Sequence, residues 1–280
     1  MEAELTQRDR DLIEQLLNDY AQWAPAEAHR PAFAGSLNGG HSHRTVLLRG
    51  DTQRWVLRLA RQPLPRDANH HREPVIQATA AQAGIAPPVL LADPDLGLLL
   101  CPYVDALGGR ETVADLAVLL KRIHSLAPRG PTLHIAQRLQ DPLTSPVDKR
   151  LALPLSAHRR RLAQTADRLQ ANAGSPRLCH NDLLCANRRL TASGLIALDW
   201  EYACSGDPFF DLAVTASELE PAQATELLTR YLDRPPSDCE WQHFTDHRLA
   251  YAVIAAAWYA RHQPTALTEA LGALQQALEN

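Results

Sequence analysis

Short apolar runs separated by turn residues make up the part of the chain from about residue 32 to 103. The runs "RTVLLRG" and "RWVLRLA" flank the turn "GDTQ", and "PPVLLA" and "LGLLLCPYV" flank "DPD". Apolar runs of this length between Gly, Asp and Pro residues are typical of β-hairpins. Between the two hairpins, "HHREPVIQATAAQAG" predicts one helix that ends at Gly84, while Pro74 leaves its first residue open.

From about residue 111 onward the apolar positions recur at helical spacing. The stretches "ETVADLAVLLKRIHSL" and "LPLSAHRRRLAQTADRLQANAG", and several more from residue 207 to the end, predict helices. One stretch differs: "RLCHNDLLCANRRLTASGLIALDWE" has short apolar runs and predicts a loop, a strand, a turn over "TASG" and a second strand. This hairpin places Asn187 and Asp199 at adjacent strand ends.

Composition places the chain among globular, enzyme-sized proteins. Its 280 residues are 45% hydrophobic and 21% charged, which supplies apolar material for one large core or two smaller ones. The net charge of −4 excludes nucleic-acid binding by a global basic field. The stretch "MEAELTQRDRDLIEQLL" is charged and amphipathic, and no run of about 18 uncharged apolar residues occurs. We therefore expect a cytoplasmic protein without a membrane span.

The stretch "CHNDLLCAN" at residues 179–187 allows two kinds of chemistry. Cys179, His180 and Cys185 are possible metal ligands, although they lack the paired short spacings of a structural zinc site and Cys204 is the nearby further sulfur. Alternatively, the acid and the Asn within the stretch are the working residues and the cysteines are packing. The five cysteines of the chain are scattered and odd in number, which favours reduced thiols.

Phosphoryl transfer from a nucleotide is the reaction that accounts for the acid and the Asn as working residues. It requires an acid near the acceptor hydroxyl, ligands for Mg²⁺, a cation on the phosphates and a loop that closes over them. Asp182 precedes Asn187 by five residues, which is the spacing of the H-R-D-x-x-x-x-N catalytic loop, and "LIALD" ends in an acid as a D-F-G motif begins with one. Asp182 would then be the catalytic base, and Asn187 and Asp199 would be catalytic metal ligands.

Two stretches, "HNDLLCAN" and "LIALDWEYACSGDPFFDLA", resemble the choline/ethanolamine kinase family and bacterial thiamine kinases, within the wider aminoglycoside phosphotransferase group. Further landmarks follow in the family's order: "SLNGGHSHRT" resembles the nucleotide loop, "WVLRLA" the third strand, "HHREPV" the helix with the partner acid and "LLLCPYV" the hinge. The resemblance covers roughly residues 33–215. It implies an α+β, protein-kinase-like fold of two lobes: a nucleotide-binding lobe with a small antiparallel sheet over residues 1–103, and a mostly helical lobe with the catalytic loop and acceptor pocket over residues 104–280.

The resemblance also implies a role for each matching position. Arg58 would bind the phosphates of ATP and Glu73 would pair with it. An arginine keeps its charge in any surroundings, which suits phosphate binding better than proton transfer. Asp211 would brace the catalytic loop, through His180 or through a loop amide. The other nucleotide contacts would come from the loop residues Gly39, Gly40 and Ser42 and the hinge residues Cys101 and Tyr103.

Two departures from the family pattern limit the range of functions that the resemblance implies. Trp200 and Glu201 follow Asp199 in place of Phe and Gly, and the short distance from there to Asp211 leaves no room for a peptide-binding activation segment. A protein kinase is therefore not expected. His43 stands in the nucleotide loop where relatives often carry Asn, and its contacts stay open.

The acceptor pocket of the family lies between the catalytic loop and the C-terminal helices. In "RLAYAVIAAAWYARHQ", Tyr251, Ile254 or Ala255, and Trp258 share one helical face, although such a stripe is more often core than pocket. Trp200 and Glu201 are further candidates for acceptor contacts.

The expected function is transfer of a phosphoryl group from ATP, with Mg²⁺, to a hydroxyl of a small cationic alcohol such as choline, ethanolamine or thiamine. An aminoglycoside or amino-sugar phosphotransferase is the alternative enzyme, and a nucleotide-binding pseudokinase is the alternative from another class. The only partner implied is the small-molecule acceptor, and the oligomeric state is left unassigned.

Overall fold

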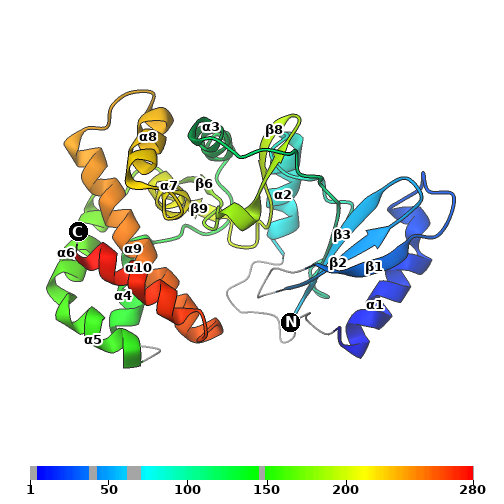
Figure 1. The fold of residues 1–280 in the computed structure, drawn as a ribbon, viewed down its shortest axis with the longest axis horizontal. Helices are drawn as coiled ribbons and strands as arrows, with labels where there is room; N and C mark the ends of the chain where they lie inside the picture. Colours follow the sequence, from blue (N-terminus) through cyan, green and yellow to red (C-terminus); the bar gives the residue numbers. More distant parts are fainter. Residues whose placement is uncertain (1–4, 38–42, 62–70, 145–148, 280) are drawn as a thin grey trace. The chain divides into compact units, whose positions relative to one another are not determined.

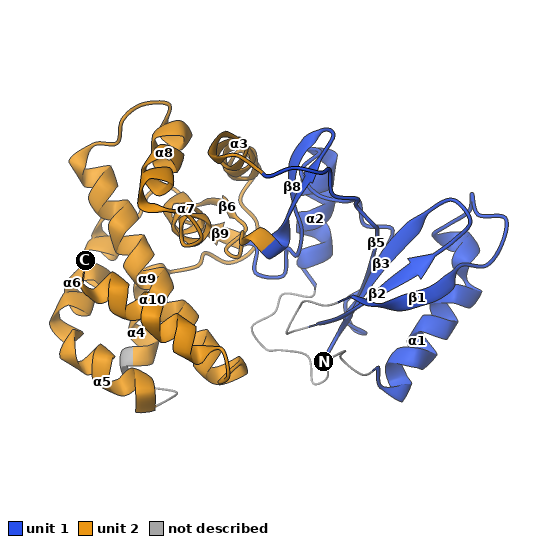
Figure 2. Ribbon diagram, in the orientation of Figure 1, with its two compact units in different colours: residues 1–110, 186–203 blue, residues 111–185, 204–280 orange. Residues whose placement is uncertain are grey.

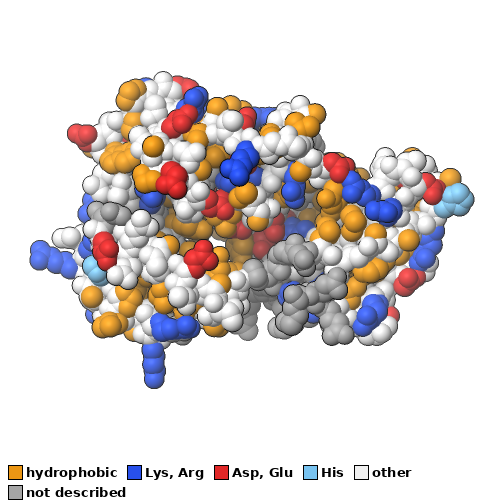
Figure 3. All heavy atoms as spheres, viewed as in Figure 1, with side chains coloured by type: hydrophobic (Ala, Val, Ile, Leu, Met, Phe, Trp, Pro, Cys, Tyr) orange, Lys and Arg blue, Asp and Glu red, His pale blue; other side chains and the backbone are white. Residues whose placement is uncertain are grey.

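The computed structural model describes residues 5–37, 43–61, 71–144 and 149–279. They form two compact units, which Figure 2 distinguishes by colour. Unit 1 consists of residues 1–110 and 186–203, and unit 2 consists of residues 111–185 and 204–280. Charged side chains of both signs are interspersed over the face shown in Figure 3, as the small net charge suggests.

Unit 1 is built on a five-stranded antiparallel sheet with the strand order β1-β2-β3-β5-β4. The two predicted hairpins are present as β2–β3 and β4–β5. The sheet packs against helix α1 (Figure 1), and the short 3₁₀ helix η1 follows α1. The bounds are α1 (Gln7–Asn18), η1 (Tyr20–Gln22), β1 (Ala32–Leu37), β2 (His43–Arg49), β3 (Arg54–Ala60), β4 (Leu91–Asp93) and β5 (Leu98–Pro102).

The core of unit 1 lies between α1 and the sheet. Alternate residues of the strands, such as Leu48 and Leu57, point into it and are fully buried. Trp23 and Trp55 meet edge to face with ring centroids 5.1 Å apart. Burial of each such side chain contributes about 1.5–3 kcal/mol to folding. The hydrophobic alternation thus fixes the face of β3 that points away from the core, and Arg58 lies on that second face.

Helix α2 (Glu73–Gln82) and the hairpin of β7 (Arg188–Thr191) and β8 (Gly194–Ala197) complete unit 1. The helix begins at Glu73, inside the predicted run, because Pro74 fits the first turn of a helix, where its missing N–H has no partner to lose. The amide of Ala197 donates to the carbonyl of Ile85 at 2.8 Å. This bond joins the hairpin to the segment after α2, so residues 186–203 group with unit 1, whereas the sequence assigned them to the lobe 104–280.

Unit 2 is mostly helical, with one two-stranded sheet of β6 and β9. The predicted stretch around residues 153–174 forms two helices, because His158 leaves the helical conformation at φ −107° and ψ 14°. Figure 1 shows α10 lying beside the long helix α9. The bounds are α3 (Val113–His124), α4 (Ile135–Thr144), α5 (Lys149–Ala157), α6 (Arg159–Ala171), β6 (Arg177–Cys179), η2 (Cys185–Asn187, which continues into unit 1), β9 (Cys204–Gly206), α7 (Pro208–Ala216), α8 (Pro221–Leu232), α9 (Asp238–His262) and α10 (Leu267–Glu279).

The core of unit 2 is formed by apolar faces of α4, α5, α6, α7, α9 and α10. Helix α9 contributes Leu249, Ala250, Val253, Ala256 and Ala260, a stripe at helical spacing. Capping boxes at Thr112 and Ser237 fix where α3 and α9 begin. The antiparallel sheet followed by mostly helical structure confirms the predicted fold class. In the part of the chain that the structure describes, no helix is long and apolar enough to cross a lipid bilayer.

Candidate active site

Arg58 is the centre of a polar cluster in unit 1. Its side chain, on β3, donates one hydrogen bond to Glu73, the first residue of α2. Its second terminal nitrogen donates to Oδ1 of Asp199 at 2.6 Å. The side chains of Arg58 and Glu73 are only 12% and 4% exposed. A strand, a helix start and the segment after β8 therefore converge on one guanidinium.

His43 on β2 also contacts Arg58. Its Nδ1 lies 3.0 Å from a terminal nitrogen of Arg58 and 3.4 Å from Oε2 of Glu201. The residue whose role the sequence left open is therefore a buried side chain that contacts both Arg58 and Glu201.

The charges of this cluster shift its ionisation. Burial opposes the charged guanidinium, but Asp199, Glu73 and Glu201 outweigh it and hold the pKa of Arg58 above its ordinary value. Burial raises the pKa of Glu73, and Arg58 counteracts that effect only in part. Three carboxyl groups thus surround one permanent cation, and the cluster favours a further positive charge.

Asn187 and Asp199 lie at the two ends of the β7–β8 hairpin, as the sequence predicted for the strand ends. The amide of Leu198 donates to the carbonyl of Asn187 at 2.8 Å, which joins the two ends. Asp199 has a left-handed backbone at φ 60°, which costs a non-glycine residue roughly 1–3 kcal/mol and is found most often at functional sites. A carboxylate and a side-chain amide supply the hard oxygen ligands that Mg²⁺ prefers, so this donor set fits a magnesium ion.

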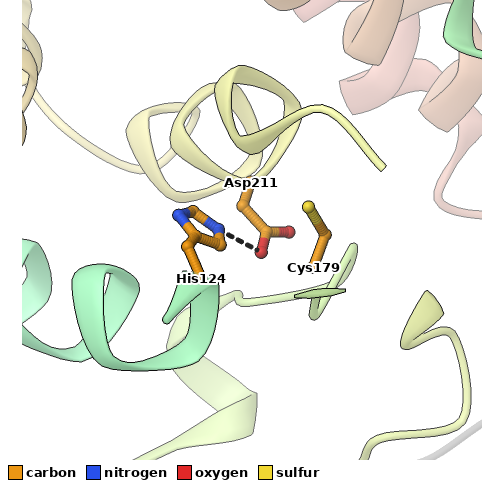
Figure 4. A group of neighbouring side chains, drawn as sticks. All are labelled: His124, Cys179 and Asp211. Carbon is orange, nitrogen blue, oxygen red and sulfur yellow. Dashed lines mark hydrogen bonds and ion pairs between the residues drawn. The ribbon is translucent and has the colours of Figure 1, made fainter. Parts of the chain in front are cut away.

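Asp211 on α7 holds the segment that carries Asp182 in unit 2. Its carboxylate accepts hydrogen bonds from the amides of His180 at 2.7 Å and Asn181 at 2.6 Å. Nε2 of His124 lies 3.0 Å from the same carboxylate (Figure 4). Asp211 is fully buried, and Asn181 adopts a left-handed backbone at φ 65°. The loop immediately before Asp182 is therefore fixed by two backbone hydrogen bonds to one buried acid, which also contacts His124 of α3.

The alternative metal site at the start of this loop does not assemble. Cys179 is fully buried, and burial raises the pKa of its thiol well above the ordinary value, whereas Cys185 is exposed. Among the described residues, Cys179 instead groups with His124 and Asp211 (Figure 4). The carboxylate of Asp211 there accepts from two backbone amides of the loop, so this group is a structural network.

The aromatic stripe of α9 lies on a different face from its core stripe. Tyr251, Ile254 and Trp258 are half-buried, so the face is only partly core. Tyr259, which the sequence analysis did not select, lies beside Trp258 with ring centroids 5.3 Å apart and nearly perpendicular planes. This face can offer aromatic surface to a small molecule.

Two acids act electrostatically on that face. Burial raises the pKa of Tyr251 and Tyr259, and the carboxylates of Asp182 and Glu218 raise it further. Glu218 also accepts a hydrogen bond from the amide of Cys185 at 2.7 Å, so it is joined to the loop after Asp182. Sequence reasoning missed Glu218, because a single exposed acid after a helix carries no distinctive pattern.

The remaining predicted site residues have mixed placements. Gly39, Gly40 and Ser42 lie outside the described residues. Cys101 is buried on β5, where its Sγ lies 3.0 Å from Nε2 of Gln77, and the amide of Tyr103 donates to the carbonyl of Arg54 at 2.8 Å. Trp200 is fully buried in unit 1, so its ring is packing and cannot contact an acceptor.

Comparisons with known proteins agree with this arrangement. A family model described as the phosphotransferase enzyme family matches residues 35–241. A thiamine kinase from Salmonella typhi is 29% identical over 245 residues, which cover 82% of each protein. A choline/ethanolamine kinase family protein from Mesorhizobium loti matches in structure with a TM-score of 0.75 at 20% identity, over 96% of this chain and 93% of that one. The choline kinase LicA from Streptococcus pneumoniae matches with a TM-score of 0.70 at 16% identity, over 96% and 98% of the two chains.

Some of the similar structures contain nucleotides. LicA has been solved in complex with AMP, and a spectinomycin phosphotransferase, with a TM-score of 0.59 at 13% identity, has been solved with ADP and spectinomycin. At these identities the structural likeness shows a kinase-like fold. The family model adds evidence of common ancestry, because the sequence that it matches includes both the Arg58 cluster and the Asp182 loop. The chain therefore belongs to the phosphotransferase enzyme family.

Proposed function

We propose that this phosphotransferase transfers the γ-phosphoryl group of ATP to a hydroxyl of a small cationic alcohol, with choline, ethanolamine and thiamine as the leading candidates. The observation that carries the choice of acceptor is the half-buried aromatic face of α9, on which two carboxylates act. A cation is stabilised by both partners: by the face of an aromatic ring and by a nearby acid.

The residues of unit 1 are proposed to bind the nucleotide. Arg58 binds the phosphates, and Glu73 and His43 hold its side chain in place. Asn187 and Asp199 hold Mg²⁺, which when bound neutralises charge on the transferred phosphoryl group. Gly39, Gly40 and Ser42, which lie outside the described residues, are predicted from the family resemblance to bind the nucleotide. The hinge around Cys101 and Tyr103 binds adenine through backbone groups other than the Tyr103 amide, which the sheet already uses.

Asp182 is proposed as the base. It accepts the proton of the acceptor hydroxyl as the oxygen attacks the γ-phosphorus, and the bond to the β-phosphate oxygen breaks to release ADP. Asp211 is a positioning residue, because it holds the backbone before Asp182 through two amides. Because ATP is the phosphoryl donor, we place this activity in the cytoplasm.

A panel of acceptors tests this function. ADP formation would be followed with choline, ethanolamine, thiamine, kanamycin and N-acetylmuramic acid, using Asp182→Asn as the control for background hydrolysis. We expect choline or thiamine to give the highest kcat/KM and the uncharged sugar to give none above background. A clear preference for kanamycin would move the assignment to the aminoglycoside phosphotransferases. No turnover with any acceptor, despite nucleotide binding, would favour a pseudokinase.

A further inference from the structure

A second cluster of ionisable side chains lies in unit 2, outside the residues proposed for phosphoryl transfer. Asp207 begins α7, and His243 and His247 come from α9. Nε2 of His243 lies 2.8 Å from Oδ2 of Asp207, and Nε2 of His247 lies 3.5 Å from the same oxygen. The two imidazole rings are 4.6 Å apart and nearly perpendicular. One carboxylate oxygen and two ring nitrogens therefore converge on a small volume.

Helical spacing explains why the histidines meet. Residues four apart lie on the same face of a helix, and His243 and His247 both face the N-terminus of α7. They are only 8% and 2% exposed. Within the described residues, Nδ1 of His247 and Nδ1 of His243 make no hydrogen bond, and the contact of His247 Nε2 with Asp207 is long for one. Burying polar atoms without good partners is unfavourable, and a bound ion would offset that cost.

The three side chains are of the kind that binds a metal cation. A carboxylate oxygen and imidazole nitrogens are ligand types that zinc takes in proteins. Because His243 and His247 both approach the same oxygen of Asp207, the ligand atoms are already gathered at one point.

The distances suit a transition metal ion. The three ligand atoms lie within 4.8 Å of one another. Zinc bonds of about 2.0–2.1 Å in a tetrahedral site place neighbouring ligand atoms about 3.3 Å apart, close to the 3.5 Å already present between His247 and Asp207. His243 would move away from Asp207 by about half an ångström to exchange its hydrogen bond for a metal bond.

A cavity of about 390 Å³ adjoins the cluster and supplies room for a fourth ligand. Asp207 and His243 line it, together with Cys239, Glu240 and Tyr231. Cys239 stands one turn before His243 on the same helix and is exposed. The coordination position that the three ligands leave vacant would therefore face this cavity.

We propose that Asp207, His243 and His247 form a binding site for a divalent transition metal ion, most readily Zn²⁺, whose fourth position opens into this cavity. Imidazole nitrogens select zinc over magnesium, so the site is chemically distinct from the oxygen ligands Asn187 and Asp199. Asp207 also caps α7, because its Oδ1 accepts from the amide of Phe209 at 2.9 Å. A bound ion would thus stabilise the helix that carries Asp211, and with it the loop before Asp182.

Metal titration of the full chain tests the proposal. Co²⁺ would serve as a spectroscopic probe and Zn²⁺ as its competitor, with excess Mg²⁺ present to occupy the oxygen-ligand site. We expect one equivalent of Co²⁺ to give the visible absorption of a tetrahedral site, and Zn²⁺ to displace it. His243→Gln, His247→Gln and Asp207→Asn should each weaken binding by at least tenfold, and Asn keeps the helix cap. His262→Gln, on the same helix, is the matched control.

Thermal unfolding gives a second readout. Zn²⁺ should raise the midpoint temperature of unfolding of the wild type and of His262→Gln, but not that of His243→Gln. Circular dichroism would verify that each variant is folded. If His247→Gln does not fold, Asp207→Asn takes its place in the comparison. Sub-stoichiometric binding in the wild type would overturn the proposal. So would binding of equal strength in the three ligand variants and the control, or binding lost only in Cys185→Ser or Cys239→Ser, which would show adventitious thiol ligation.

Discussion

Asp182, Asp199 and Asp211 have the same side chain but three different environments. Asp211 is fully buried and accepts hydrogen bonds from backbone amides. Asp199 accepts a hydrogen bond from Arg58. The charge of Asp182 raises the pKa of Tyr251 on α9. The spacing of acids in the sequence selected these three positions, and their functional roles stay predictions. It could not predict that His43 would contact Arg58, because that contact depends on the pairing of β2 with β3.

Asp182→Asn tests the proposed base. The substitution keeps the size of the side chain but removes its ability to take a proton. We expect kcat to fall by roughly 100- to 10,000-fold, the usual contribution of a positioned general base. ATP affinity should be retained, because the proposed nucleotide contacts lie on other residues. Steady-state rates and an equilibrium titration with ATP measure the two quantities, and turnover near the wild-type rate would remove Asp182 from the mechanism.

Asp199→Ala tests the proposed magnesium ligands. Loss of this carboxylate should abolish both the Mg²⁺-dependent part of ATP affinity and the activity, because the phosphate charge is then poorly compensated. Cys185→Ser, an exposed substitution near Asn187 in the sequence, is the control and should leave both intact. Titrations with ATP at several Mg²⁺ concentrations measure the effect. Affinity that depends on Mg²⁺ as strongly in Asp199→Ala as in the wild type would place the ion elsewhere.

Helix α9 carries two faces with proposed functions, an aromatic face and the side with His243 and His247, in addition to its core stripe. The period of its apolar residues predicted the helix, but the same period fits core residues and an aromatic binding face equally well. Packing against α4, α6, α7 and α10 decides which residues are buried. Similarly, the sequence missed the break between α5 and α6, because it falls at His158 and not at Pro154, the proline within α5.

Trp258→Ala tests the aromatic face of α9. The acceptor cation would contact this face in both the ground state and the transition state, so its loss should raise KM more than it lowers kcat. A cation–π contact of about 1–2 kcal/mol corresponds to roughly 5- to 30-fold in KM for a cationic acceptor. Glu218→Gln should raise KM in the same direction. Steady-state kinetics with the best acceptor measure both, and an unchanged KM in Trp258→Ala would exclude this face from acceptor binding.

At the scale of the whole molecule, the two compact units are not two continuous stretches of sequence, because each is made of two separate segments. Residues 186–203 form a hairpin that the sequence predicted, yet they belong with unit 1 because of contacts such as the Ala197–Ile85 hydrogen bond. A hydrogen bond between residues so far apart in the sequence produces no local sequence pattern from which it could be predicted. The result is that Asp182 lies in unit 2 while Asn187, five residues later, lies in unit 1. The proposed base and the proposed metal ligands are joined by one short stretch of chain.

The proposed reaction is phosphorylation of the hydroxyl of a cationic alcohol. It is tested most directly by mass spectrometry of the products after incubation with ATP, Mg²⁺ and an equimolar mixture of choline, ethanolamine, thiamine, kanamycin and N-acetylmuramic acid. We expect one cationic alcohol to gain a single phosphoryl group, in an amount equal to the ADP formed, and Asp182→Asn to form no such product. Phosphorylation of N-acetylmuramic acid or kanamycin in preference to all three cationic alcohols would contradict it.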